Sequence, residues 1–322
     1  MDKPALKVLF FGTPDFAVET LKQIHRKGYE IVAVVTTPDK PAGRGRKLKK
    51  SAVKRYAEQH GLLLLQPEKL KDEQFIETIK SLQPDVGVVV AFRILPRQVY
   101  EIPRLGTFNL HASLLPDYRG AAPINHVIIN GEKETGITTF FLNDKVDTGE
   151  ILLQEKVPVD KKETAGSLHD KLMYRGAELV LETLQKIEAG EIEPQPQPDL
   201  TNLHPAPKLT RENTRIDWHQ PGEYIERFIR GLSPYPGAWS MMRLNSEKSM
   251  RCVLYLADFE PGEPHPDSGK IHWDGKNFRI AVRDGWIIPQ LIKTEGKKTL
   301  PRKDFINGLK NIKIDKNIAR CY

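Results

Sequence analysis

The chain has 322 residues, enough for about two domains with separate cores, and its 39% apolar and 28% charged residues are ordinary for a soluble globular protein. No run approaches the roughly 18 apolar residues of a membrane span, and the first residues lack the small-residue cleavage site of a signal peptide. The two cysteines, Cys252 and Cys321, are far apart and have no histidine at metal-ligand spacing. We therefore expect a cytoplasmic protein with neither disulfides nor a bound metal.

The formal net charge of +7 is unevenly distributed. The positive excess lies mainly in residues 208–322. A second concentration is KPAGRGRKLKKSAVKR, from Lys40 to Arg55, which holds eight basic residues and no acidic one. Segregated positive charge is typical of proteins with a polyanionic partner, although a solvated charge run explains either cluster alone equally well.

Short apolar runs alternate with amphipathic segments through the first 190 residues. Strands are predicted at 7–11, 31–37, 62–65, 86–92, 107–113, 137–143 and 150–159, and helices after Thr13 and over 51–60, 72–80, 121–131 and 164–189. Near-continuous Val and Ile runs separated by helices indicate a parallel sheet covered on both faces. Residues 1–190 are therefore predicted to form a doubly wound, Rossmann-like α/β domain, which binds ligands beyond the carboxyl ends of its strands.

The remaining chain changes character. Residues 191–207 are rich in Pro and Gln without periodicity, which is typical of a linker. Residues 208–322 contain a short helix near 222–231 and then brief alternating segments separated by turns such as DGK and DGW. This pattern predicts a small, OB-like β-barrel domain.

The stretch FNLHASLLPDYRGAAPINHVI, Phe108 to Ile128, carries the strongest chemical signal. Strand side chains alternate between faces, so Asn109 and His111 emerge together at the carboxyl end of one strand. An Asn amide can donate to a developing oxyanion, and a His can carry a proton near neutral pH. With no evident nucleophile nearby, this pair favours acyl transfer by direct attack of an external amine. The alternative is that His111 is a hydrogen-bonded structural histidine.

A second polar island is NDKVDTGEILL, which contains Asp147 between two predicted strands. A carboxylate near His111 would orient the imidazole and stabilise its protonated form. The alternative is an ordinary turn aspartate that caps its own backbone.

These segments resemble the methionyl-tRNA formyltransferase family, within the folate-dependent formyltransferase superfamily. The resemblance covers both predicted domains. Its motifs are FGTPDFAV (11–18), PDKPAGRGRKL (38–48), NLHASLLPDYRGAAPI (109–124), ETGITTF (134–140), VDTGEIL (146–152) and RIDW (215–218). The Asn-x-His pattern with a distant Asp is shared across the superfamily, whereas the basic loop and the C-terminal domain resemble the tRNA-specific branch.

The resemblance implies a catalytic set of Asn109, His111 and Asp147, with 10-formyltetrahydrofolate as the formyl donor. It also implies a folate pocket at the ends of two strands. The implied folate contacts are Ser113, Leu114, Leu115, Pro116, Val90, Phe92 and Leu95. One departure from the family pattern is Arg93, in a turn that usually contains glycine and is one residue longer.

The acceptor implied by the resemblance is the α-amino group of methionine on charged initiator tRNA. The basic loop would reach the acceptor stem, and the positive C-terminal domain would hold the tRNA backbone. The implied tRNA-binding residues are Lys40, Arg44, Arg46, Lys47, Lys49 and Lys50, with Lys297, Lys298, Arg302 and Lys303 as further candidates. The resemblance also implies a monomer.

Three other functions compete with this one. An NAD-dependent oxidoreductase shares the fold class, but FGTPDF has one glycine where a dinucleotide-binding loop has three. A non-enzymatic RNA-binding protein explains the charge but not the Asn109, His111 and Asp147 set. A folate-dependent formyltransferase that acts on a small amine, such as glycinamide ribonucleotide or an amino sugar, explains the catalytic set but does not need the basic stretch.

Overall fold

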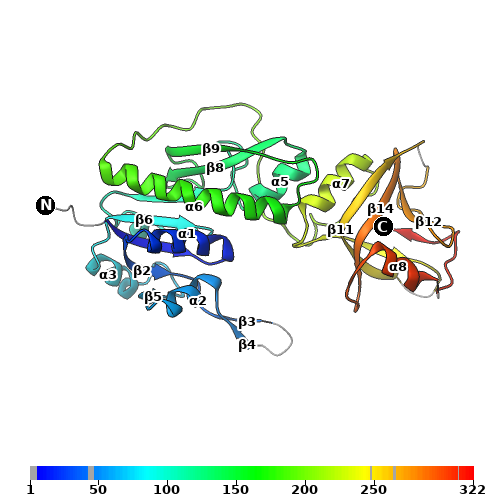
Figure 1. The fold of residues 1–322 in the computed structure, drawn as a ribbon, viewed down its shortest axis with the longest axis horizontal. Coiled ribbons are helices and arrows are strands. Elements are labelled where there is room, and N and C mark those ends of the chain that lie inside the picture. Colours follow the sequence, from blue (N-terminus) through cyan, green and yellow to red (C-terminus); the bar gives the residue numbers. More distant parts are fainter. Residues whose placement is uncertain (1–5, 43–46, 247–248, 264–265, 311) are drawn as a thin grey trace. The chain divides into compact units, whose positions relative to one another are not determined.

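The computed structural model describes residues 6–42, 47–246, 249–263, 266–310 and 312–322. The chain forms two compact units, drawn in Figure 1. The first unit contains Met1–Gly120, Glu134–Pro158 and His169–Pro205, and the second contains Ala121–Lys133, Val159–Leu168 and Ala206–Tyr322. Two short segments that precede residue 190, Ala121–Lys133 and Val159–Leu168, therefore group with the C-terminal part.

A seven-stranded sheet in the order β5-β2-β1-β6-β7-β8-β9 forms the centre of the first unit. The strands are β1 (Lys7–Gly12), β2 (Glu30–Val35), β5 (Leu64–Leu65), β6 (Val86–Val90), β7 (Thr107–His111), β8 (Glu134–Phe141) and β9 (Ile151–Pro158). The first five in spatial order are parallel, and β8 and β9 add an antiparallel edge. The chain order reverses between β1 and β6, which is where such sheets bind ligands.

Helices cover both faces of this sheet, as predicted. α6 (Ala165–Ala189) lies on one face, where the Thr183 and Thr139 hydroxyls are 2.9 Å apart and Gly176 permits close contact with Leu110. α1 (Asp15–Arg26) adjoins α6 through the Phe16 and His169 rings. α3 (Glu73–Ser81) and α4 (Arg97–Tyr100) pack on the opposite face. The buried residues of that face are Leu9, Phe11, Ala33, Val35, Phe75, Ile76, Ile79, Val89, Leu95 and Val99. The predicted doubly wound class is confirmed.

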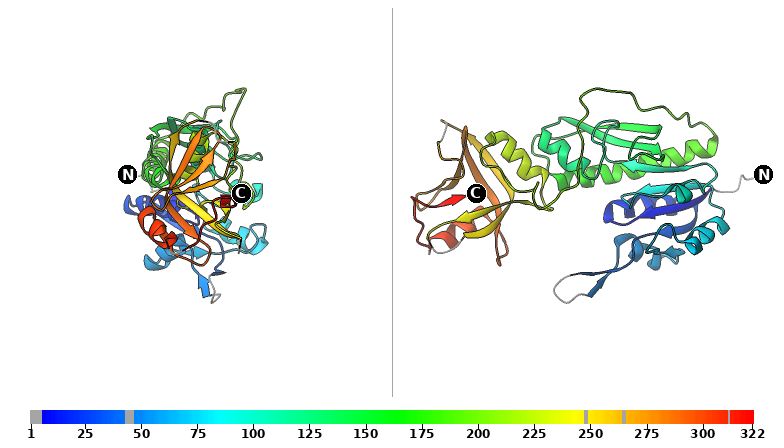
Figure 2. Two further views of the ribbon diagram at one scale, coloured as in Figure 1. Left: turned by 90° about the vertical axis from the view of Figure 1, so that its right-hand side faces the viewer. Right: turned by 180° about the vertical axis from the view of Figure 1, so that it is seen from behind.

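The basic stretch contains a feature that was not predicted, a short antiparallel hairpin of β3 (Lys40–Ala42) and β4 (Lys47–Lys49). It projects from the sheet of the first unit (Figure 2). α2 (Ala52–Gln59) follows and is capped by the Ser51 hydroxyl, which accepts the Lys54 N–H at 3.0 Å. The helix therefore begins where the sequence predicted it.

The second unit is an antiparallel barrel in the order β12-β13-β14-β11-β10-β16, with β15 beside β14. Its strands are β10 (Ala238–Arg243), β11 (Ser249–Pro261), β12 (Ile271–Trp273), β13 (Phe278–Val282), β14 (Gly285–Thr294), β15 (Thr299–Pro301) and β16 (Arg320–Cys321). Backbone bonds from Ile271 to Ala319 and from Cys321 to Gly269 join the two edge strands. The sheet therefore closes, as the predicted barrel requires.

Three helices accompany the barrel: α5 (Pro123–Asn130), α7 (Gly222–Gly231) and α8 (Arg302–Leu309). α7 packs on β11 and on α5, where the Asn125 side chain donates to the Gly231 carbonyl at 2.7 Å. Both cysteines lie free and buried in the barrel core.

Candidate functional site

Asn109 and His111 stand at the carboxyl end of β7, between β6 and β8. Asn109 is half-buried, and only 6% of His111 is exposed. The Nε2 atom of His111 lies 3.0 Å from the Tyr118 carbonyl oxygen. Because a carbonyl oxygen only accepts hydrogen bonds, Nε2 carries the proton of this bond. The remaining ring nitrogen, Nδ1, is left for proton exchange.

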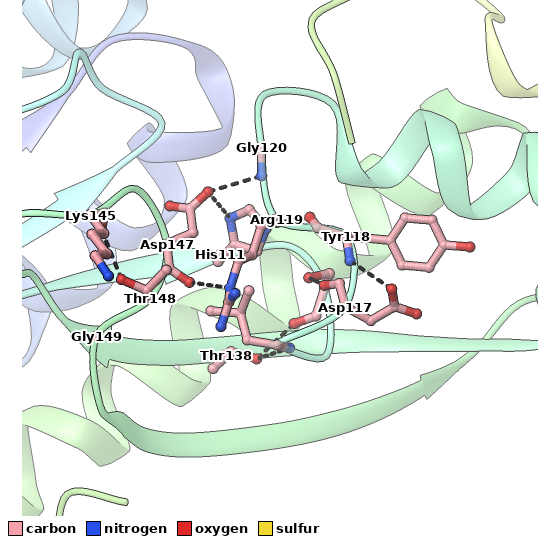
Figure 3. Close-up of polar contacts among 12 residues, drawn as sticks. His111, Asp117, Tyr118, Arg119, Gly120, Thr138, Lys145, Asp147, Thr148 and Gly149 are labelled. Carbon is pink, nitrogen blue, oxygen red and sulfur yellow. Dashed lines mark hydrogen bonds and ion pairs between the residues drawn. The ribbon is translucent and has the colours of Figure 1, made fainter. Parts of the chain in front are cut away.

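Asp147 comes to His111 from the loop between β8 and β9. Its Oδ2 atom lies 3.9 Å from His111 Nδ1 and accepts the Gly120 N–H at 3.0 Å, as Figure 3 shows. A 3.9 Å separation is longer than a hydrogen bond, so the two groups attract as charges when Nδ1 is protonated. The fold thus brings His111 and Asp147 together, although they lie on different strand connections.

The backbone of the Asp147 loop is strained and tightly packed. Asp147 has φ = 54°, a left-handed conformation that costs a non-glycine residue about 1–3 kcal/mol and persists only where its surroundings fix it. A Cβ atom on Gly149 would lie 1.6 Å from the Phe141 carbonyl oxygen. No other residue type fits at Gly149 without moving the chain, so the loop lies directly against the end of β8.

The segment after His111 is held by side chains of the antiparallel strands. The Thr138 hydroxyl donates to the Ser113 carbonyl at 2.7 Å, and the Gln154 amide donates to the Leu115 carbonyl at 3.0 Å. Ser113, Leu115 and Pro116 are buried, and half-buried Leu114 packs over Gly136. These four predicted folate contacts therefore form one fixed turn beside the catalytic strand.

The other predicted folate contacts follow β6. Val90 and Leu95 are buried, and the half-buried Phe92 ring lies 5.7 Å from the Phe11 ring. Arg93, the departure from the family pattern, donates to the carbonyls of Pro67 and Glu68 at 2.9 and 3.1 Å. Its guanidinium is thus used to tie the turn after β6 to the segment after β5.

The base of the β3–β4 hairpin is anchored by polar side chains. Lys54 Nζ lies 2.8 Å from both Asp39 Oδ2 and Gln66 Oε1, and Gln66 donates to the Thr37 carbonyl at 2.9 Å. Hydrogen bonds from Lys54 and Gln66 lower the pKa of the Asp39 carboxyl. Among the predicted tRNA contacts, Lys50 is paired with Glu58 at 2.7 Å, whereas Lys40 and Lys49 are exposed. Arg44 and Arg46 lie outside the described residues, as does the Lys47 side chain.

Two comparisons of the sequence identify its family. A family described as formyl transferase matches residues 6–184, and its C-terminal domain matches residues 208–310. A methionyl-tRNA formyltransferase of Bacteroides fragilis is 48% identical over 312 residues, which are 96% of both chains. One from Parabacteroides distasonis is 48% identical over 97% of this chain and 98% of its own. This chain belongs to the methionyl-tRNA formyltransferase family.

A solved structure supports the same fold at lower similarity. HypX from Aquifex aeolicus, determined in complex with tetrahydrofolic acid, superposes with a TM-score of 0.64 at 20% identity. The match covers 96% of this chain and 48% of HypX, so the chain spans about half the length of that protein. At this identity the likeness establishes the fold alone.

The second unit carries a cluster of arginines around Trp239 that the sequence did not predict. The guanidinium carbons of Arg211, Arg215 and Arg251 lie 5.4, 5.6 and 4.9 Å from the centre of the Trp239 ring. No ion pair joins any of the three to a carboxylate within the described part of the chain. Stacked, unneutralised arginines are suited to phosphate groups. Arg211 and Arg215 lie close together in the chain, and Arg215 begins the RIDW motif. Trp239 and Arg251 come from β10 and β11, so the sequence did not show that the four side chains meet.

Two residues beside Asp147 were also not predicted as site residues. Arg119 lies in the quoted motif as part of YRG, and its Nε donates to the Asp147 carbonyl at 3.0 Å. Gln197, in the Pro- and Gln-rich segment, donates to the same carbonyl at 2.9 Å. The position of Arg119 in a family motif could have suggested a role for this residue. Nothing in the sequence suggested Gln197, because a segment rich in Pro and Gln does not reveal which glutamine contacts the rest of the protein.

A cavity of about 1240 Å³ lies at the opposite, amino end of β1 and β6. Its wall includes Asp85, whose carboxylate accepts the Lys7 N–H at 2.8 Å and the Arg104 side chain at 2.6 Å. Burial raises the pKa of Asp85, but these two hydrogen bonds outweigh it and leave the pKa below its ordinary value. Because ligands of such sheets bind at carboxyl ends, we assign this cavity no part in the reaction.

Within the described residues, no helix is long and apolar enough to cross a membrane. The same residues include no group of three or more His, Cys, Asp or Glu side chains placed to hold a metal ion.

Proposed function

We propose that this protein transfers the formyl group of 10-formyltetrahydrofolate to the α-amino group of methionine on charged initiator tRNA, for translation initiation. The observation that carries the proposal is the facing pair of His111 and Asp147 at the carboxyl edge of a formyltransferase sheet, with Asn109 on the same strand. The relatives named methionyl-tRNA formyltransferase match nearly the whole chain at 48% identity, which supports the acceptor.

In this proposal the folate binds between two segments: the turn that follows His111 and the segment that follows β6. Val90, Phe92, Leu95 and Leu115 give that region apolar walls, which suit a flat heterocycle, and the turn backbone offers hydrogen-bonding groups. Ser113, Leu114 and Pro116 complete the proposed contacts. The bound folate supplies an activated formyl group, and the protein needs no nucleophile of its own.

Each of the three catalytic residues has a separate role in the transfer: Asn109, His111 and Asp147. The acceptor amine has an ordinary pKa near 7.7–8, so a nucleophilic fraction exists at neutral pH without a strong base. Asn109 and protonated His111 donate hydrogen bonds to the formyl oxygen as negative charge develops there. His111 also moves a proton toward the departing folate nitrogen, while Asp147 faces the imidazole and orients it. The formyl carbon forms its new bond to the amine directly, without a covalent enzyme intermediate.

Two basic surfaces bind the tRNA in this proposal. The β3–β4 hairpin, with Lys40, Arg44, Arg46, Lys47, Lys49 and Lys50, contacts the acceptor stem, and its anchored base limits how far it can swing. Arg211, Arg215 and Arg251 of the barrel contact phosphates, in addition to Lys297, Lys298, Arg302 and Lys303. Each cation that neutralises a phosphate releases a counterion from the RNA, which makes the binding depend on salt.

The organisation of the protein is part of the proposal. Residues 1–190 act as the catalytic domain, 191–207 as the linker and 208–322 as the tRNA-binding domain. The protein acts as a cytoplasmic monomer without a metal. The family matches, which end at residue 184 and resume at 208, support this division.

The experiment that tests the function offers three acceptors with 10-formyltetrahydrofolate: charged initiator tRNA, glycinamide ribonucleotide and a free amino sugar. We expect formylation of the charged tRNA alone. Formylation of a small amine alone would keep the proposed chemistry but overturn the acceptor and the roles of both basic surfaces.

A further inference from the structure

Arg119 and Gln197 both donate hydrogen bonds to the main chain at Asp147. The Arg119 Nε donates to the Asp147 carbonyl at 3.0 Å, and the Gln197 amide donates to that carbonyl and to the Gly149 carbonyl, both at 2.9 Å. Gln197 Oε1 in turn accepts bonds from Arg119 Nε and Nη2 at 3.1 and 2.5 Å. Each residue therefore holds both the loop and its partner.

These bonds fix the orientation of the peptide group after Asp147, and this orientation determines the direction of the Asp147 carboxylate. A carbonyl oxygen has two lone pairs, and that of Asp147 receives two donors, so its hydrogen-bonding capacity is filled. Asp147 has the unfavourable φ of 54°, which needs external support. With the peptide plane fixed, the Cα–Cβ bond of Asp147 directs the carboxylate toward the Gly120 N–H and His111 Nδ1, as Figure 3 shows.

We propose that Arg119 and Gln197 are positioning residues for the formyl-transfer reaction, which hold the Asp147 carboxylate in the direction that supports His111. The proposal rests on the proposed function, because it assigns the pair a role in that same reaction. Both side chains bond to the main chain of the Asp147 loop, and neither needs to touch the reacting atoms. Loss of the pair should therefore lower kcat and leave both KM values nearly unchanged.

The chain supplies a matched control for Gln197. The segment that carries Gln197 is held beside β9 by main-chain bonds between Gln195 and Ile151, at 2.7 and 2.8 Å. These bonds do not need either glutamine side chain. The Gln195 amide donates to the Glu193 carbonyl at 3.3 Å, away from the Asp147 loop. Gln195→Ala removes a glutamine side chain from the same segment without removing a bond to that loop.

The first test compares steady-state formyl transfer to charged initiator tRNA by the wild type, Gln197→Ala, Gln197→Glu and Gln195→Ala. Gln197→Glu keeps the shape and the acceptor for Arg119 but removes the donors to the two loop carbonyls. We expect both Gln197 variants to lose about 10- to 100-fold in kcat, as a displaced supporting group does, with unchanged folate and tRNA KM and wild-type activity for Gln195→Ala. Wild-type kcat in Gln197→Glu would overturn the proposal.

A second test separates positioning from general stability. If Gln197 acts through Asp147, then Gln197→Ala should cause no further loss of kcat in an Asp147→Ala background. Losses that multiply in the double variant would overturn the proposal, because they would show that Gln197 acts independently of Asp147. The wild-type assay separates the two hypotheses. If the wild type formylates no charged tRNA, the proposed function is refuted. If the wild type is active and both Gln197 variants have the same kcat as the wild type, only this inference is refuted.

Discussion

The Nδ1 atom of His111 and the Oδ2 atom of Asp147 face each other at 3.9 Å, with the Asp147 carboxylate anchored by the Gly120 N–H. The imidazole is fixed on its other side by the Tyr118 carbonyl. A histidine that is hydrogen-bonded at Nε2, with Nδ1 facing a carboxylate at the end of a strand, is placed to carry a proton during a reaction. This relationship motivates the first prediction.

His111→Ala should reduce formyl transfer by about 10²–10⁴-fold, the usual contribution of a positioned proton-transfer group. The fold should survive, because the strand is held by main-chain pairing to β6 and β8. Single-turnover rates with charged tRNA measure the effect. His60→Ala at the exposed end of α2 is the control and should retain wild-type rates. Near-normal turnover in His111→Ala would contradict the assigned role.

Asn109→Ala should lower kcat by about 10²–10³-fold, the loss expected when one oxyanion donor is removed, with little change in the KM for folate. The side chain is half-buried on β7, so the substitution leaves no large cavity. Steady-state kinetics with varied folate would show the separation of kcat from KM. A variant that loses folate affinity but retains kcat would assign Asn109 to binding instead.

Lys49→Ala should weaken tRNA use more than Lys50→Ala. Lys50 already pairs with Glu58, and a hydrogen bond from that pairing raises the Lys50 pKa, whereas Lys49, also exposed, has no ion pair with another described residue. We expect Lys49→Ala to raise the tRNA KM and to reduce the slope of log affinity against log salt by about 1. Folate binding should be unchanged in both variants. Equal loss of folate and tRNA binding would argue against an RNA contact.

The sequence predicted the part of the site that depends on secondary structure alone. Strand alternation places Asn109 and His111 on one face without knowledge of the fold. It could not place Asp147 against His111, because that contact depends on how the β8–β9 loop packs against the end of β7. Gln197 could not be predicted for a related reason. Its role depends on a tertiary contact with the Asp147 loop, and the sequence around Gln197 has no pattern that indicates this contact.

The same limit explains the fold features that were missed. α2 and α7 were predicted because caps and amphipathic spacing are local. The β3–β4 hairpin lies in a strongly basic stretch, where charge obscures the strand pattern, and three-residue strands are too short for periodicity. Cys252 and Cys321, far apart in sequence, lie together in the barrel core, where a hydrogen bond that the Cys321 thiol donates to Cys252, together with burial, raises the pKa of Cys321.

Asp85 gives a prediction about stability and pH. Its folded-state pKa lies below the unfolded value of about 3.9, so the ionised carboxylate stabilises the fold above that pH, and this contribution is lost as pH falls through the folded pKa. Asp85→Asn should lower the free energy of unfolding by about 1–2 kcal/mol at pH 7. The difference from wild type should shrink below pH 4 in thermal melts. A difference that stays constant down to pH 2 would show that the ionised form is not responsible.

The central claim is that the formyl group passes directly from folate to the methionine amine at the edge formed by Asn109, His111 and Asp147. Rapid-quench single turnover with a ¹⁴C-formyl donor and charged initiator tRNA tests it most directly. We expect label to move from folate to the tRNA-bound methionine in one phase, and protein precipitated at every time point to be unlabelled. Label that appears first on the protein, or that never reaches the tRNA, would contradict it.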